Sequence, residues 1–179
     1  MKTIYFVRHG ETQSNIDKLF SGSSDNPPLT KKGLEQAKEA GEKLIMLDKV
    51  DLVVSSPLLR ARDTAKIIAE EVGYDPNNIV YNELLVERSF GFYDGKPRDE
   101  YNLDDENSTV QDKGESVKDF YHRAIQAFDW LKNRDEQTIL VVSHGGMGRM
   151  FRLVDRNISH DDYHVVESFG NCEIDEFTI

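Results

Sequence analysis

The sequence alternates short runs of β-branched and aromatic residues with longer segments in which apolar residues recur at helical spacing. These patterns predict strands at Ile4–Val7, Leu52–Ser55, Ile79–Tyr81, Ile139–Val142 and Glu173–Ile179. They predict helices at Lys32–Leu47, Leu59–Val72, Ser116–Leu131 and Gly146–Val154, with Thr30 and Ser116 as N-caps. We therefore expect one three-layer α/β/α domain over residues 1–179, in which helices flank a mostly parallel central sheet.

Two long segments show neither the strand pattern nor the helical spacing of apolar residues. Residues 15–29 are rich in Ser, Asp, Gly and Pro, and residues 83–114 carry many charged side chains. We expect both to be loops, the second with a single helical turn. Because long loops in a compact domain often carry function, the second is a candidate part of a binding site.

The charge balance limits the possible partners. The chain has 33 acidic and 22 basic side chains, which give a formal net charge of -11. Such an acidic chain binds nucleic acid and anionic membrane surfaces poorly, so we expect neither partner. A site for an anionic ligand must then be a local basic pocket. The lone cysteine, Cys172, excludes an internal disulfide, and the apolar N-terminal run is too short for a signal peptide or a membrane span. We expect a cytoplasmic protein.

Three predicted strands end in reactive side chains. The first ends in Arg8-His9-Gly10, the second in Ser55-Ser56-Pro57 with Arg60 and Arg62 just beyond, and another in Ser143-His144-Gly145-Gly146. Ligands of α/β sheets bind beyond the carboxyl ends of the strands, so these residues are expected to meet at one edge. Arginine matches the oxygens of phosphate, and a neutral histidine can attack phosphorus.

The sequence contains no motif of a common metal or nucleotide site. It has no HExxH or CxxC spacing, no GxxxxGK[ST] loop and no GxGxxG loop. We therefore expect no metal and no cofactor, and a small phosphorylated molecule as substrate.

The segment Arg8-His9-Gly10-Glu11-Thr12 resembles the signature of the histidine phosphatase superfamily, the phosphoglycerate mutase-like proteins. Further blocks similar to that family follow in order, from about residue 3 to about residue 148: Asn15, Phe20-Ser21-Gly22, Pro28 to Ala37, Ser55 to Ala65, Leu85 to Gly91, Asp94-Gly95, Gly114-Glu115-Ser116 and Val142 to Gly146. The resemblance implies the same α/β/α fold and chemistry on phosphate esters.

The resemblance also implies a role for each matching residue. His9 would form a phosphohistidine intermediate, and Glu87 would protonate the leaving oxygen and then accept a proton from water. Arg8, Arg60 and His144 would surround the phosphoryl group. The anion site would be completed by Asn15, by the Ser21-Gly22 backbone and by the Gly145 N–H. Arg98 would bind a carboxylate or a second anionic group of the substrate.

Several departures from the mutase pattern favour a phosphatase. Only 18 residues separate Gly95 from Gly114, where mutases carry a longer insertion with paired arginines, and this segment contains Asp99, Glu100, Asp104, Asp105, Glu106 and Asp112. Phe90 and Gly146 stand where mutases place a tyrosine and an asparagine. The loop between Gly22 and Leu29 is one residue longer than usual, through Pro27-Pro28. The alternatives are a cofactor-dependent phosphoglycerate mutase, a phosphoprotein phosphatase and a regulatory phosphate-binding module.

Other candidate residues receive structural interpretations. Arg62, His122, His160 and His164 are interpreted as solvated, Met147 and Met150 as packing residues and Cys172 as a structural thiol. The substrate, the oligomeric state and the pathway are open at this stage.

Overall fold

A five-stranded sheet forms the centre of the protein. The structure, a computed structural model, describes residues 2–46, 49–100 and 114–179. The strands are β1 (Thr3–Arg8), β2 (Leu52–Ser55), β3 (Val80–Tyr81), β4 (Thr138–Ser143) and β5 (Ile174–Thr178). Their order is β3-β2-β4-β1-β5, and only β5 runs antiparallel to its neighbour within the described sheet. The mostly parallel sheet of the sequence analysis is thus confirmed.

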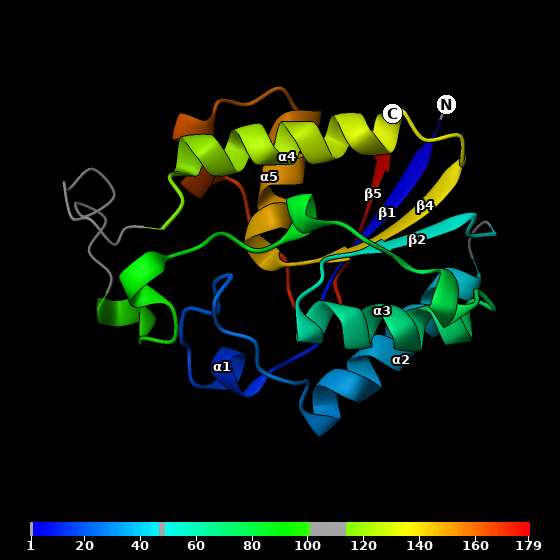
Figure 1. The fold of residues 1–179 in the computed structure, drawn as a ribbon, viewed down its shortest axis with the longest axis horizontal. Coiled ribbons are helices and arrows are strands. Elements are labelled where there is room, and N and C mark those ends of the chain that lie inside the picture. The colour runs from blue at the N-terminus through cyan, green and yellow to red at the C-terminus, as the bar shows by residue number, and fades with distance from the viewer. Residues whose placement is uncertain (1, 47–48, 101–113) are drawn as a thin grey trace.

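Helices cover both faces of this sheet. They are α1 (Gln13–Ile16), α2 (Lys31–Ile45), α3 (Leu59–Glu71), α4 (Val117–Lys132) and α5 (Gly145–Asp155). Helices α2 and α3 lie together on one face, and α4 and α5 lie on the other (Figure 1). The expected α/β/α layers are present. None of the described helices is both long and apolar enough to cross a membrane.

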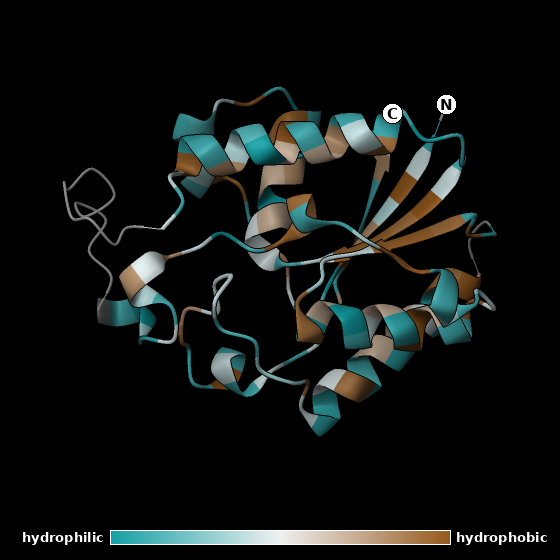
Figure 2. Ribbon diagram, in the orientation of Figure 1, coloured by the Kyte–Doolittle hydropathy of each residue, from teal (hydrophilic) through white to brown (hydrophobic). Residues whose placement is uncertain are grey.

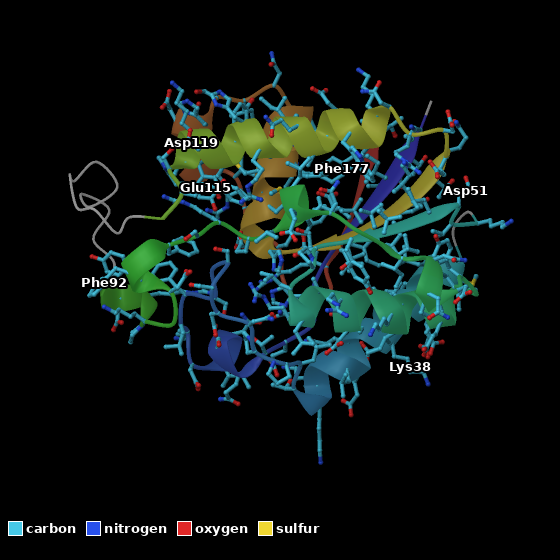
Figure 3. The ribbon with its side chains drawn as sticks, viewed as in Figure 1. Lys38, Asp51, Phe92, Glu115, Asp119 and Phe177 are labelled. Atoms are coloured by element: carbon cyan, nitrogen blue, oxygen red, sulfur yellow. The ribbon has the colours of Figure 1, made fainter. Side chains whose placement is uncertain are left out.

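The two faces of the sheet bury separate apolar cores. Phe6 of β1 packs against Phe151 of α5 and Phe169, with ring centroids 5.0 and 5.1 Å apart. On this same side Phe177 holds β5 against α4 through Phe128, at 6.3 Å (Figure 3). The opposite core contains Val53 of β2, Leu140 and Val142 of β4, and alanines of α2 and α3. Figure 2 shows mostly brown strands beside helices that mix brown and teal.

Most predicted boundaries agree with the structure to within two residues. The hydroxyls of Thr30 and Ser116 accept hydrogen bonds from the N–H groups of Gly33 and Asp119, so both N-caps are confirmed. The predicted helix end at Leu47 lies outside the described residues.

Two loop predictions were wrong in part. The segment that starts at Asn15 begins inside the short helix α1. The described part of the segment 83–114 contains three short 3-10 helices, Glu83–Leu85, Gly91–Tyr93 and Arg98–Glu100, rather than one helical turn. Two more 3-10 helices, Pro76–Asn78 and His160–Val165, carry no sequence period that predicts them. One turn is too short to show helical periodicity.

The register of the sheet brings the reactive residues together. Arg8 at the end of β1 pairs with Ser143 at the end of β4, and Ser55 of β2 pairs with Val142. The residues that follow these three strands therefore leave the sheet at one edge. His9 and His144 emerge side by side there, with ring centroids 5.3 Å apart.

Candidate active site

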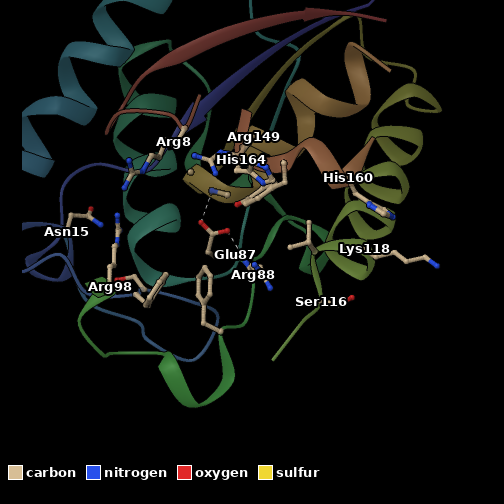
Figure 4. Close-up of a pocket in the computed structure, with 18 of the residues that line it drawn as sticks. Arg8, Asn15, Glu87, Arg88, Arg98, Ser116, Lys118, Arg149, His160 and His164 are labelled. Atoms are coloured by element: carbon tan, nitrogen blue, oxygen red, sulfur yellow. Dashed lines mark hydrogen bonds between the residues drawn. The ribbon is translucent and has the colours of Figure 1, made fainter. Parts of the chain in front are cut away.

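A cavity of about 570 Å³ opens at this edge of the sheet (Figure 4). Seven of the predicted site residues line it: Arg8, His9, Asn15, Ser21, Glu87, Arg98 and Gly145. The other three, Gly22, Arg60 and His144, are buried. Arg60 and His144 lie directly behind His9 and contact its ring.

The ring of His9 is held in one tautomer. Its Nδ1 lies 2.7 Å from the carbonyl oxygen of Gly10, which can only accept, so Nδ1 carries the proton. On the other side Arg60 Nε, which can only donate, lies 3.3 Å from His9 Nε2. The lone pair of His9 is therefore on Nε2. An imidazole of this form is suited to nucleophilic attack through Nε2.

Arg60 is fully buried at the start of α3 and is fixed by backbone carbonyls. Its terminal nitrogens donate to the carbonyl oxygens of Asp25, Ser21 and Gly22 at 2.6, 3.0 and 3.1 Å. The Ser21-Gly22 backbone thus contributes by positioning this guanidinium. Direct contact of this backbone with the anion, which the family resemblance implies, stays a prediction.

His144 presents an unpaired ring nitrogen. Ser56 Oγ accepts the N–H of Leu58 and lies 2.8 Å from His144 Nε2. When this hydroxyl donates to Nε2, the ring proton is on Nδ1. The Nδ1 atom is buried and has no hydrogen-bond partner among the described residues. In that tautomer it is a preset donor for an oxygen of a bound anion.

Burial and nearby arginines keep both imidazoles uncharged. Desolvation, followed by the charges of Arg60 and Arg8, holds the pKa of His9 well below its usual 6.5. The pKa of His144 is lowered in the same way, mainly by burial and then by Arg60. Both rings are neutral at pH 7, which nucleophilic attack by His9 requires.

Glu87 is held on the other wall of the cavity by two backbone N–H groups. Its Oε1 accepts from the N–H of Arg88 and its Oε2 from the N–H of Gly146, both at 2.9 Å. A Cβ on Gly146 would lie 2.3 Å from Glu87 Oε1. The absence of a side chain at position 146 is therefore required for this carboxylate position.

Asn15 is oriented by a residue that the sequence analysis missed. The Asn15 Oδ1 atom accepts from the N–H of Thr12 at 3.2 Å and from Asn171 Nδ2 at 3.0 Å. Its amide nitrogen is therefore on the opposite side of the group. Asn171 also donates to the carbonyl oxygen of His9, at 3.1 Å. No local motif marks Asn171, because it reaches the site only through the pairing of β5 with β1.

His160 and His164, interpreted as solvated, both line the cavity, and His164 is exposed there. Arg149 of α5 and Lys118 of α4 line it as well (Figure 4). By contrast, Arg62 and His122 are exposed and outside the cavity lining, and Met147 and Met150 are fully buried, as predicted. Cys172 is half-buried, and desolvation raises the pKa of its thiol to about 12, which agrees with a structural residue.

The cavity has the parts needed for phosphoryl transfer. It combines a neutral nucleophile, buried guanidinium and imidazole donors, and a carboxylate on the opposite wall. Within the described ranges, no group of three or more His, Cys, Asp or Glu side chains is placed to hold a metal ion.

Comparison with known families shows to which family the chain belongs. The model of the histidine phosphatase superfamily, branch 1, matches residues 4–179. The chain belongs to the histidine phosphatase superfamily. It is 31% identical to a 2,3-bisphosphoglycerate-dependent phosphoglycerate mutase from Bartonella bacilliformis over 179 residues, which cover 90% of this chain and 84% of that protein.

Solved structures of the superfamily share the fold over nearly the whole chain. The α-ribazole phosphatase of Shigella flexneri has a TM-score of 0.83 at 26% identity, and the match covers 99% of this chain and 90% of that one. A phosphoserine phosphatase variant of Entamoeba histolytica, solved with phosphoserine, has a TM-score of 0.82 at 28% identity over 99% and 91% of the two chains. The superfamily relatives thus include both mutases and phosphatases.

Proposed function

We propose that this protein is a metal-independent phosphatase that hydrolyses small phosphate monoesters through a phosphohistidine on His9. The observation that carries the proposal is the state of His9. Its ring is buried and neutral, it has its lone pair on Nε2, and it contacts Arg60. Arg60 and His144 contact this ring, so donors for phosphoryl oxygens lie beside the attacking nitrogen.

In the first step the Nε2 lone pair of His9 attacks phosphorus. The N–P bond forms as the ester P–O bond breaks, and Glu87, protonated at this stage, transfers its proton to the leaving oxygen. Arg8, Arg60 and the Nδ1–H of His144 donate to the phosphoryl oxygens. Donors of this kind each contribute about 3 kcal/mol to the transition state in other enzymes.

In the second step water takes the place of the alcohol. Glu87, now a carboxylate, accepts a proton from water while the water oxygen attacks phosphorus. The N–P bond breaks, phosphate leaves, and His9 and Glu87 return to their starting states. Asn15, fixed by Asn171, orients an oxygen of the phosphoryl group in both steps.

The choice of phosphatase over mutase rests on the wall around Glu87. Phe90 lines this wall and stacks on Phe20 at 4.5 Å, and Gly146 leaves no room for the asparagine of mutases. Of the acidic segment invoked in the sequence analysis, Asp99 and Glu100 are described, and the other four acidic residues, between residues 101 and 113, lie outside the described residues. The 31% identity to a named mutase supports the mutase alternative, as does the register of Arg98 with a basic substrate-binding position of mutases.

Product analysis separates these activities. The purified protein is incubated with p-nitrophenyl phosphate and with 3-phosphoglycerate, the latter with and without 2,3-bisphosphoglycerate. We expect phosphate release from the aryl ester and no 2-phosphoglycerate. Formation of 2-phosphoglycerate faster than phosphate release would establish the mutase. Absence of turnover on a panel of phosphorylated metabolites and on phosphopeptides would favour a phosphate-binding module instead.

A further inference from the structure

The cavity continues past Glu87 along one face of α5. Gly146, whose N–H holds Glu87, and Arg149 are three residues apart on this helix and so lie on the same side of it. Arg149 therefore lies one helical turn beyond the Gly146 N–H that holds Glu87, the proposed general acid. The leaving oxygen must approach Glu87, so the alcohol portion of the substrate has a direct path towards Arg149.

Arg149 is a cation without an anionic partner. Its Nε atom is buried and has no hydrogen-bond partner among the described residues. The guanidinium lies over the ring of Tyr163, 4.7 Å from the ring centroid. Stacking fixes the plane of an arginine and leaves its N–H edge available to a ligand.

His164 from the 3-10 helix His160–Val165 borders the same part of the cavity, next to Arg149, whereas Lys118 from α4 lines the cavity farther away, beyond His160 (Figure 4). Apart from Glu87, the described carboxylate in the cavity lining is that of Asp161, which lies 3.1 Å from His160 Nδ1 and is 82% exposed. Asp161 is therefore engaged with His160 rather than with Arg149.

Unpaired basic groups in a cavity need an explanation in a chain of net charge -11. A buried, unpartnered guanidinium nitrogen is costly in the empty protein, and a bound anion removes that cost. We infer that Arg149, with His164, binds a second anionic group, a carboxylate or a phosphate, on the alcohol portion of the substrate. This inference rests on the proposed function for the position of the phosphoryl group.

Arg98, the residue singled out by the sequence analysis, is less suited to this role. It is exposed, and its Nε already donates to the carbonyl oxygen of Leu19 at 3.1 Å. It lies on the Asn15 side of Glu87, across the cavity from Arg149 (Figure 4). Arg98 is therefore a comparison residue for the test.

A matched pair of ligands isolates the second anion. 3-Phosphoglycerate carries a carboxylate at the position where glycerol 3-phosphate carries a hydroxymethyl group. Calorimetric titration of the His9→Ala protein, which cannot turn them over through His9, should show at least tenfold tighter binding of 3-phosphoglycerate. Propane-1,3-diol bisphosphate, compared with 3-hydroxypropyl phosphate, tests phosphate as the second anion in the same way.

Variants then locate the preference. In the His9→Ala background, Arg149→Gln should bring the ratio of the two dissociation constants to within threefold of unity. Arg156→Gln, an equal charge change at the far end of α5, and Arg98→Gln should keep it. If Arg149→Gln fails to fold by circular dichroism, His164→Gln must reduce the ratio by at least threefold.

The outcomes distinguish this inference from the proposed function. A preference that survives Arg149→Gln, or that is absent from the His9→Ala protein for both ligand pairs, overturns the inference whether or not the wild type is a phosphatase. A preference lost in Arg149→Gln, in a protein whose wild type hydrolyses no ester, supports the subsite and rejects the phosphatase.

Discussion

The inner and outer parts of the cavity are built differently. Around His9 the side chains of Arg60 and Glu87 are buried and each is held by at least two hydrogen bonds, as Arg60 is by three carbonyl oxygens. Around Arg149 the side chain of His164 is exposed, and no described residue pairs with it.

This difference separates the chemistry from the choice of substrate. A preorganised inner shell stabilises the same transition state for any phosphate ester, because its donors do not move when charge develops. The outer groups act only when a ligand supplies their missing partner. The inner part should therefore determine kcat for all esters, and the outer part should determine which ester binds.

The largest effect is expected at Arg60. In Arg60→Gln the carbonyl oxygens of Asp25, Ser21 and Gly22 lose their charged donor and His9 loses its neighbour. We expect kcat/KM to fall about 10³-fold for every ester and the free energy of unfolding to fall by about 3 kcal/mol. Steady-state kinetics and denaturant unfolding measure both.

Arg62→Gln, on the exposed side of the same helix, is the matched control and should change neither quantity by much. A loss at Arg60 confined to esters with a second anion would contradict the division into inner and outer parts.

Glu87→Gln tests the general acid. Removal of the proton donor should slow hydrolysis of an alkyl phosphate by about 10²-fold. Hydrolysis of p-nitrophenyl phosphate, whose leaving group needs no proton, should slow by less than about tenfold. The ratio of the two rate constants is the measurement. Equal losses on both esters would mean that Glu87 acts only on structure.

Gly146→Ala tests the role of Glu87 as general acid without changing a reacting group. The added Cβ would lie 2.3 Å from Glu87 Oε1 and displace the carboxylate. We expect about a tenfold loss with alkyl phosphates and a smaller one with the aryl ester, by steady-state kinetics. Gly170→Ala, where a Cβ would meet no atom closer than 3.4 Å, serves as control. An unchanged leaving-group dependence in Gly146→Ala would show that this contact is not needed.

The smallest effect concerns stability against acid. The pKa values of His9 and His144 are lowered in the folded state, whereas in the unfolded chain each imidazole has its ordinary pKa of 6.5. Below that pH the unfolded chain therefore binds more protons than the folded protein. The free energy of unfolding should therefore decrease by about 1 kcal/mol per imidazole from pH 7.5 to pH 5.5. Denaturant unfolding of the His9→Gln, His144→Gln double variant should show a shallower dependence than wild type, and an equal slope would contradict neutral native rings.

Sequence reasoning located the inner part because its residues follow strands. His9 and His144 stand directly after apolar runs, and parallel strands end at one edge, so their meeting could be deduced. The N-caps Thr30 and Ser116 could also be predicted from the sequence, because capping is a local interaction.

The outer part and the supporting contacts could not be read in this way. Arg149 and His164 meet because the chain after α5 folds back over it, and Asn171 reaches His9 from a distance of 162 positions along the chain. Such contacts depend on long-range packing, for which the sequence has no period or motif. The single domain over residues 1–179 and the cytoplasmic location remain predictions.

Trapping the intermediate tests the central claim most directly. The wild-type protein, quenched during turnover of a ³²P-labelled ester, should carry an acid-labile, base-stable label on the peptide that contains His9. His9→Ala should carry no label and release no phosphate. A label on another residue, or undiminished turnover by His9→Ala, would contradict the role of His9 as the phosphoryl acceptor.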